Sequence, residues 1–320
     1  MSTRTDGTIE LRVFTEPQLG ADYAMLLEAA KATEELGYGA FFRSDHYLKM
    51  GDVSGEPGAT DAWITLAGLA RDTSTIRLGT LLTSNTFRHV GPLAVSVAQV
   101  DAMSGGRVEL GLGAGWYDDE HSAFGIPLPT VRERFDDLED SLSALDAWWY
   151  PESSDRSATF DFSGHRLELT DSPMLTRPLQ ERLPIIVGGH GKKRTPSLAA
   201  RFADEFNVPF ASAADTARIN ANVDAICAEQ GRDPKTLLRS AAQVVCCGES
   251  NAEIERRAAA IGREPAELRE NGLAGTPEEI IAKAKSYAAE TGISRIYLQF
   301  LDLRDLDHLA LVAEKVMPEL

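Results

Sequence analysis

Two periodicities alternate along this chain, and that alternation limits its fold more than any other feature. Short runs rich in apolar and β-branched residues are followed by longer stretches in which apolar residues recur every three or four positions. The short runs are typical of buried strands, and the longer stretches are typical of helices that cover them. The candidate strands, eight in all, are Ile9–Thr15, Gly39–Arg43, Ile76–Leu82, Val108–Leu112, Pro184–Val187, Phe206–Pro209, Ala241–Cys247 and Arg295–Phe300.

Helical segments separate these strands. Residues Asp22–Leu36 and the segment 306–316 each place their apolar side chains on one helix face. Thr276 and Glu279 form a capping box with Pro277 in the first turn, so a helix is expected to start there. Further helices are predicted at Asp61–Arg71, Pro92–Met103 and Val131–Trp149.

Eight strands alternating with helices favour an α/β fold in which a parallel sheet closes into a (β/α)8 TIM barrel. An open, doubly wound sheet is the alternative, but no G-x-G-x-x-G follows the first strand, which disfavours its dinucleotide-binding form. We expect a single domain over residues 1–320, with insertions near 150–182 and 248–276. The first insertion alternates apolar and polar residues around Ser163 and Gly164, which predicts a hairpin. The second is charged and helical, and we expect it to cap the barrel mouth.

The charge balance argues against several classes of partner. The chain has 32 Lys and Arg against 49 Asp and Glu, a formal net charge of -17. An acidic surface repels phosphate backbones, so neither nucleic acid nor an anionic membrane is an expected partner. No apolar run of roughly 18 residues and no secretory signal is present. Three cysteines, two of them adjacent, suit a reducing cytoplasm, and neither they nor the histidines have the spacing of metal ligands.

In such a barrel, functional residues gather in the loops after the strands. Asp45 and His46 follow the second strand, and a carboxylate beside an imidazole can orient or charge it for proton transfer. The alternative is a solvated loop histidine or a helix cap. After the fourth strand, Gly111, Gly113 and Gly115 either free the backbone for close approach to a ligand or form a tight barrel corner.

The strongest signal follows the fifth strand. Gly188, Gly189 and Gly191 leave backbone amides open, and a helix is expected to begin near Pro196. Amides at a helix N-terminus bind phosphate, and the basic run Lys192–Arg194 is the dense basic cluster of an acidic chain. A glycine turn with a solvated basic face is the alternative. We interpret the loop as a phosphate site.

These loops also resemble those of the bacterial luciferase-like superfamily, and within it the F420-dependent oxidoreductases. The segments that carry the resemblance are Glu35–His46, Leu78–Thr83, Thr86–Arg88, Met103–Arg107 with Glu109–Trp116, and Ile186–His190 followed by Ala203–Asn207. The resemblance implies a barrel with a cofactor laid across its mouth and a non-proline cis peptide at Leu81–Leu82. Trp116 stands where the sugar-phosphate dehydrogenase branch of the family has an acidic residue, which argues against that activity.

Carried over by position, the resemblance implies that His46 is the catalytic residue, as a proton donor or a group that orients substrate. It also implies apolar walls from Trp116, Phe87 and Tyr47, with Glu16 facing the pocket. The residues implied to contact the cofactor, the last four around its phosphate, are Asp45, Leu81, Leu82, Thr83, Ser84, Gly115, Trp116, Glu120, Gly188, Gly189, His190 and Thr195.

The expected function is therefore hydride transfer between coenzyme F420 and a small organic substrate. An FMN-dependent luciferase-like monooxygenase is one alternative, because a phosphate cradle suits both cofactors. A flavin- or deazaflavin-binding protein without turnover is the other. The family also implies a homodimer, which no apolar patch in the sequence demonstrates.

Overall fold

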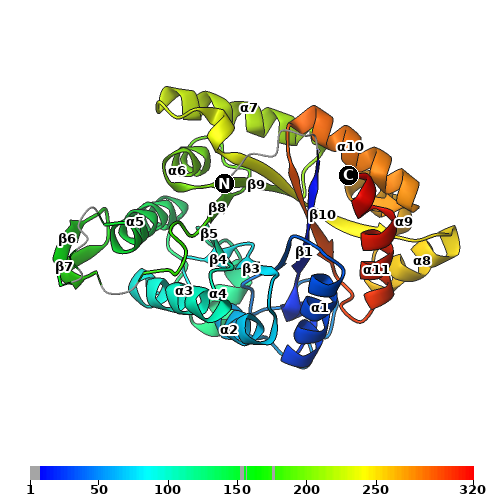
Figure 1. Ribbon diagram of the computed structural model, residues 1–320, viewed down its shortest axis with the longest axis horizontal. Coiled ribbons are helices and arrows are strands. Elements are labelled where there is room, and N and C mark those ends of the chain that lie inside the picture. Colours follow the sequence, from blue (N-terminus) through cyan, green and yellow to red (C-terminus); the bar gives the residue numbers. More distant parts are fainter. Residues whose placement is uncertain (1–7, 152–154, 156, 175–176) are drawn as a thin grey trace.

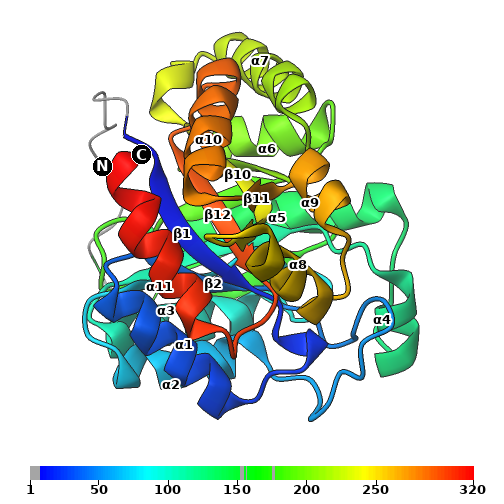
Figure 2. The ribbon, with the colours of Figure 1, turned by 90° about the vertical axis from the view of Figure 1, so that its right-hand side faces the viewer.

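The computed structural model describes residues 8–151, 155, 157–174 and 177–320. Within them, parallel strands close into a barrel and helices pack around its outside, as Figures 1 and 2 show. The ring closes where β12 pairs with β1, so the predicted (β/α)8 barrel is confirmed. In ring order its strands are β1 (Glu10–Thr15), β2 (Ala40–Arg43), β3 (Arg77–Thr80), β5 (Val108–Gly113), β8 (Ile185–Gly188), β9 (Glu205–Pro209), β10 (Leu238–Cys247) and β12 (Arg295–Phe300).

The strand boundaries differ from the prediction by more than one residue in two places. The third strand was expected to run to Leu82, but β3 ends at Thr80 and the short strand β4 (Thr83–Ser84) follows it. The implied cis peptide between Leu81 and Leu82 is present at this interruption. Strand β10 begins at Leu238, earlier than expected, because its polar first residues pair with β9 inside the closed ring.

The helices cover the barrel in the predicted order. Helix α3 begins two residues before Pro92, because the first turn of a helix leaves its N–H groups unpaired and tolerates proline. Thr276 and Glu279 form the predicted capping box at the start of α10. The helices are α1 (Tyr23–Glu35), α2 (Ala62–Asp72), α3 (Val90–Ser104), α4 (Asp118–Phe124), α5 (Val131–Trp149), α6 (Arg194–Phe202), α7 (Ala213–Glu229), α8 (Asn251–Ala260), α9 (Pro265–Asn271), α10 (Pro277–Thr291) and α11 (Leu306–Lys315), with 3-10 turns at Pro17–Leu19, Pro234–Thr236 and Met317–Glu319.

The first insertion contains the predicted hairpin. Strands β6 (Thr159–Ser163) and β7 (Glu168–Pro173) pair in antiparallel fashion. Residues 152–154, 156 and 175–176 of this insertion lie outside the described residues. The buried Asp140 of α5 fixes the turn, since its carboxylate accepts the backbone N–H groups of His165, Arg166 and Leu167 at 2.7–3.0 Å.

The second insertion does not cap the barrel mouth as expected. Strand β10 is long enough to extend beyond the ring, and β11 (Leu273–Gly275) pairs with its last residues. Helices α8 and α9 bury Ile254 and Leu268 against the same outer part of β10. This apolar contact holds the insertion beside the mouth, where it extends the wall.

Paired charges fill the N-terminal half of the barrel interior. Buried Arg12 donates to Glu109 at 2.6 Å and to Glu10 at 2.8 Å, and Arg77 also pairs with Glu109. We call this set, with Arg295 and Glu205, the ion-pair layer: Glu10, Arg12, Arg77, Glu109, Glu205 and Arg295. Above it lie apolar side chains that include Phe14, Phe42 and Tyr297. Because inward positions alternate along a strand, Glu10, Arg12, Phe14 and Glu16 lead from the ion-pair layer towards the mouth.

Removing the shared carboxylate of this layer should destabilise the chain. We expect Glu109→Ala to lower the free energy of unfolding by about 3–5 kcal/mol, because it removes the fully buried partner of Arg12 and leaves only the half-buried Glu10 to balance its charge. Urea denaturation measures the change. Glu255 is exposed on α8 and provides a control, since Glu255→Ala should change the free energy by at most about 0.5 kcal/mol. Equal effects of the two substitutions would contradict the structural role of the layer.

Acid stability should depend on the same residue. Burial alone would raise the pKa of Glu109, but the charges of Arg12, Arg295 and Arg77 hold it well below its ordinary value. The stability gained from this shift is present above the unfolded-state pKa of about 4.3 and is lost as the pH falls below it. The melting temperature of Glu109→Gln should therefore fall less steeply below that pH than the melting temperature of the unmodified chain, in scanning calorimetry across a pH series.

Candidate active site

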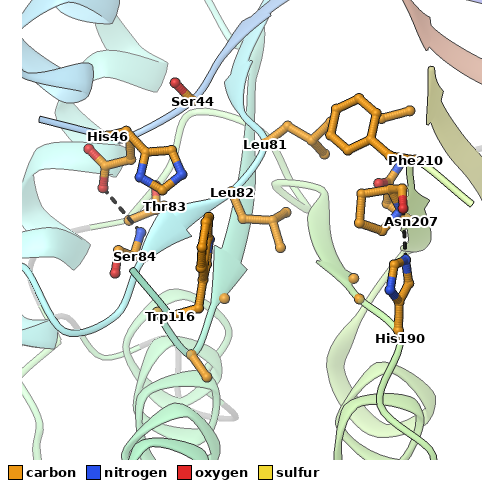
Figure 3. Close-up of a pocket in the computed structure, with 18 of the residues that line it drawn as sticks. Ser44, His46, Leu81, Leu82, Thr83, Ser84, Trp116, His190, Asn207 and Phe210 are labelled. Carbon is orange, nitrogen blue, oxygen red and sulfur yellow. Dashed lines mark hydrogen bonds between the residues drawn. The ribbon is translucent and has the colours of Figure 1, made fainter. Parts of the chain in front are cut away.

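A cavity of about 710 Å³ opens at the C-terminal ends of the barrel strands; we call it the main cavity. Figure 3 shows His46 and Trp116 on one side, His190 and Phe210 on the opposite side, and Leu81 and Leu82 between them. The predicted catalytic residue His46 and all of the predicted cofactor contacts lie on its wall. The loops that follow β2, β3, β5 and β8 are far apart in the sequence, and the closed barrel brings their ends together.

His46 is oriented by a carboxylate that the sequence pattern did not identify. Its Nδ1 lies 3.0 Å from Oε2 of Glu120, which is buried on α4. The other oxygen of Glu120 accepts the backbone N–H of Leu48 at 2.9 Å and that of Tyr47. Glu120, implied above as a cofactor contact, therefore fixes both the imidazole and the loop that carries it.

The same contacts set the charge of the pair. Burial lowers the pKa of His46, but the hydrogen bond to Glu120 and the nearby charges of Glu16, Glu120 and Asp45 raise it above its ordinary value. Burial acts to raise the pKa of Glu120, whereas His46 and two backbone N–H groups lower it, and the lowering prevails. The pair can therefore hold a proton on an oriented imidazole beside an ionised carboxylate.

Asp45 does not orient His46, contrary to the pairing expected from their adjacency. Its buried carboxylate binds Arg88 through two contacts of 2.5 and 2.9 Å and accepts the N–H of Ser84 at 3.1 Å. Successive residues of an extended segment point in opposite directions, so Asp45 turns into the protein when His46 faces Glu120. Asp45 ties the loop after β2 to the segment after β3.

The interruption of the third strand forms the floor of the main cavity. Leu81 and Leu82 pack against the apolar cluster inside the barrel. A Cβ on Gly111 would collide with the carbonyl oxygen of Thr80 and lie 2.6 Å from the side chain of Leu82. The glycine at 111 thus makes room for the neighbouring strand, in addition to any role near a ligand.

The hydroxyl groups of Thr83 and Ser84, next to this interruption, hydrogen-bond to other side chains of the protein. The hydroxyl of Thr83 accepts from Trp63 Nε1 at 3.1 Å and bonds Thr80 at 2.8 Å. The hydroxyl of Ser84 lies 2.8 Å from that of Thr86. Gly115 has a φ of 76°, and a Cβ there would lie within 2.8 Å of both Thr86 and Ser84, so this glycine is required for the close approach of the two loops.

The glycine loop after β8 leads into α6 as predicted, but the adjacent basic residues point elsewhere. Arg194 binds Asp136 at 2.5 Å and Glu139 at 3.3 Å on α5, because those carboxylates compete for its charge. Lys192 and Lys193 are exposed and do not line the main cavity. The candidate phosphate contacts are therefore backbone N–H groups of the first turn of α6, which have no intrahelical acceptor.

The remaining loop residues form the wall around that turn. Gly188 and Gly191 pack tightly, since a Cβ on Gly188 would lie 2.5 Å from the carbonyl oxygen of Asn207 and one on Gly191 would collide with Thr195. Gly189 has a φ of 130°, a conformation that favours glycine. Exposed His190 anchors the rim through a 2.7 Å contact between Nε2 and the carbonyl oxygen of Pro209.

The sequence patterns missed some residues of the main cavity wall, and two residues expected there, Tyr47 and Phe87, lie elsewhere. Tyr47 and Phe87 stack on each other outside the main cavity, where the Tyr47 hydroxyl binds Asp61 at 2.6 Å. Glu16 does line it, held by Gln299 at 2.9 Å. The alternation of inward positions along β1 and β12 would have found Phe14 and Gln299. The missed residues are Phe14, Ser44, Met50, His121, Phe135, Asn207, Pro209, Phe210, Ala242 and Gln299.

A family model described as luciferase-like monooxygenase matches residues 8–291. The chain belongs to this family. Among curated relatives, it is 29% identical over 167 residues to an F420-dependent glucose-6-phosphate dehydrogenase of Amycolatopsis mediterranei, which covers 52% of the chain and 47% of the relative. It is 30% identical over 236 residues to an F420-dependent hydroxymycolic acid dehydrogenase of Mycobacterium tuberculosis, covering 71% of the chain and 60% of the relative. The chain thus matches about half of the length of the first relative and three fifths of the second.

Solved structures share the whole fold. An F420-dependent secondary alcohol dehydrogenase in complex with an F420-acetone adduct superposes with a TM-score of 0.82 at 19% identity, covering 98% of this chain and 99% of the other. An F420-dependent tetrahydromethanopterin reductase from Methanopyrus kandleri superposes with a TM-score of 0.79 at 16% identity, covering 97% of this chain and 99% of the other.

In the described part of the chain, no helix has the length and apolar character needed to cross a membrane, and no cluster of His, Cys, Asp or Glu side chains is arranged to hold a metal ion.

The His46–Glu120 contact predicts a titration. In proton NMR, His46 should titrate above its ordinary pKa of about 6.5, and Glu120→Gln should move that titration to lower pH because the stabilising charge is lost. Glu255→Gln, at an exposed position of α8, serves as the control and should leave the titration of His46 where it is. An unchanged His46 titration in Glu120→Gln would show that the carboxylate does not set its charge.

Proposed function

We propose that this chain transfers a hydride between coenzyme F420 and a small organic substrate bound in the main cavity. The observation that carries the proposal is the layout of that cavity, with the His46–Glu120 pair on one side and the Gly188–Thr195 loop on the other (Figure 3). A cofactor with a planar reactive ring and a phosphate-bearing tail fits this layout. The F420-dependent activities named for two curated relatives favour F420 over FMN.

The wall residues fit such a cofactor by their chemistry. Leu81 and Leu82 offer an apolar surface for a ring, and Trp116, whose side chain is 63% exposed, offers a second one across the cavity. The N–H groups at the start of α6 would hold the phosphate, with the buried Thr195 beside them. Arg134 donates to the carbonyl oxygen of Gly115 and so holds the loop that carries Trp116.

When bound, F420 supplies a hydride donor or acceptor on its deazaflavin ring. His46 would hold the accompanying proton. Because Nδ1 faces Glu120, Nε2 is left without a hydrogen-bond partner among the described residues and is available to a substrate oxygen. With its pKa raised, His46 as imidazolium donates a proton when a carbonyl is reduced, and as neutral imidazole accepts one when an alcohol is oxidised.

Cofactor titration tests the proposal first. The tryptophan fluorescence of the purified chain should respond to F420 with a Kd in the micromolar range, on the order of 8 kcal/mol of binding, and much more weakly to FMN. Gly189→Ala should weaken F420 binding about tenfold or more, because it strains the loop at a φ of 130°. Gly231 also has a positive φ, 76°, but lies beyond α7 in open space, so Gly231→Ala controls for strain alone.

Other outcomes of this titration would redirect the assignment. Preference for FMN would favour a luciferase-like monooxygenase, the activity in the family's own description. Tight F420 binding without oxidation or reduction of any carbonyl or alcohol would favour a binding protein without turnover. Binding of neither cofactor would refute the proposal. A homodimer and a cytoplasmic location stay predictions.

Turnover tests the role of His46. On any carbonyl compound that the unmodified chain reduces with reduced F420, His46→Asn should lower kcat about 10²–10⁴-fold, because the proton donor is lost. The Kd for F420 should change little, since the asparagine still fits the wall. Full activity of His46→Asn would remove His46 from the mechanism and leave its pairing with Glu120 structural.

A further inference from the structure

A second cleft of about 630 Å³ adjoins the main cavity. The two spaces share Phe210 and Gln299 as wall residues, so they are separated by no more than these side chains. Its other walls come from the start of α7, from β10, from the second insertion and from α10, which lie together around β10 in Figure 2. The proposed chemistry at His46 makes no use of this cleft.

The junction between the two spaces is built around Phe210. This residue directly follows β9 and has a φ of 48°, a left-handed conformation that is rare for a bulky side chain. Its N–H donates to the carbonyl oxygen of Ala242 at 2.9 Å, which helps to fix the conformation. Backbone strain of this kind is concentrated at functional positions. The ring is nevertheless 46% exposed, so an apolar surface remains for a ligand to cover.

The two cations of the second cleft already have partners in the protein. Arg263 binds Glu267 through contacts of 3.0 and 2.5 Å, and Lys283 donates to the carbonyl oxygens of Arg269 and Glu270 at 2.6 and 3.1 Å. Among the described residues, no Lys or Arg lines the main cavity. An anionic group in the second cleft would have to compete with Glu267 for Arg263 and with two carbonyl oxygens for Lys283. It would also meet the carboxylates of Glu267 and Glu270.

Uncharged polar groups remain available. Gln243, 4% exposed, donates from Nε2 to the carbonyl oxygen of Ala211 at 2.9 Å, but its Oε1 accepts no hydrogen bond. A buried acceptor without a partner costs free energy that an O–H or N–H donor would recover. Ser286 adds an exposed hydroxyl on α10.

We propose that the second cleft holds the end of the substrate remote from the reacting carbon, and that this end is uncharged and carries hydroxyl or amide groups. That the bound molecule is a substrate rests on the proposed function, whereas the chemistry expected of its remote end rests on the residues of the second cleft alone. Phosphorylated and carboxylated molecules are disfavoured because Arg263 is already paired with Glu267 and because Glu270 adds a second carboxylate to the wall.

Disulfide tethering tests this chemistry without cofactor or turnover. All three native cysteines are buried, so Ser286→Cys introduces an accessible thiol at the second cleft. Lys285→Cys places a thiol on the adjacent exposed position, which does not line the cleft. Each variant is equilibrated with the disulfide of thioglycerol or the disulfide of 2-mercaptoethyl phosphate under mild reductant, and the modified fraction is read by intact mass.

For each variant, the fraction modified by the thioglycerol probe is divided by the fraction modified by the phosphate probe. We expect this ratio to be at least about fivefold larger for Ser286→Cys than for Lys285→Cys. That comparison cancels the general repulsion of phosphate by an acidic chain. Adding Gln243→Leu to Ser286→Cys should reduce the ratio towards that of the control. An equal ratio at the two positions, or a preference for phosphate at Cys-substituted Ser286, would overturn the proposal.

A second measurement tests the connection between the spaces. Trp116 is exposed whereas Trp63, Trp148 and Trp149 are buried, so acrylamide should quench mainly Trp116. A thioglycerol-type probe extended by a dodecyl chain, tethered to Ser286→Cys, should reduce that quenching if its chain enters the main cavity. No protection relative to tethered Lys285→Cys would disprove a continuous substrate site. Failure of the unmodified chain to bind F420 would refute the proposed function. The two tethering measurements would still show which ligand chemistry the second cleft accepts and whether it connects with the main cavity.

Discussion

Burial of paired charges inside the barrel is the constraint on which the rest of the structure depends. Arg12, Glu109 and Arg295 sit on three strands and are deprived of water, so each must meet its partner or cost several kcal/mol. A strand displaced by one residue would turn its charge outwards and its neighbour inwards. The ion-pair layer therefore fixes the register of the ring, and that register decides which side chains reach the mouth.

The candidate site shows how neighbours in sequence can have separate tasks. Asp45 and His46 are adjacent, yet one secures a loop through Arg88 and the other is presented by Glu120 from a different helix. The carboxylates of Asp45 and Glu120 are both buried and hydrogen-bonded, whereas the imidazole of His46 stays partly exposed to the main cavity. Rigid support of this kind holds a reactive group in place before any ligand arrives.

Periodicity was sufficient to predict the barrel, and the order of glycine and polar motifs was sufficient to predict the loops that meet at its mouth. The pairings were not predictable, because a helix such as α4 brings Glu120 to His46 from far along the chain, and no local pattern encodes that approach. The predicted place of Arg194 in a basic phosphate site was wrong for the same reason, since Asp136 and Glu139 bind it across a helix interface. Phe210 and Met50 lie in loops without periodicity, so their place on the wall could only be seen in three dimensions.

The acidic charge of the chain, together with the lack of Lys and Arg among the described residues that line the main cavity, has a consequence for the rate of binding. A formal charge of -17 creates a field that opposes the approach of any anion, while the proposed phosphate contacts are backbone dipoles with short reach. Added salt screens the distant repulsion more strongly than it weakens hydrogen bonds inside a partly enclosed site. Association with an anionic cofactor would then quicken as ionic strength rises, the reverse of the behaviour of enzymes that steer anions with surface lysines.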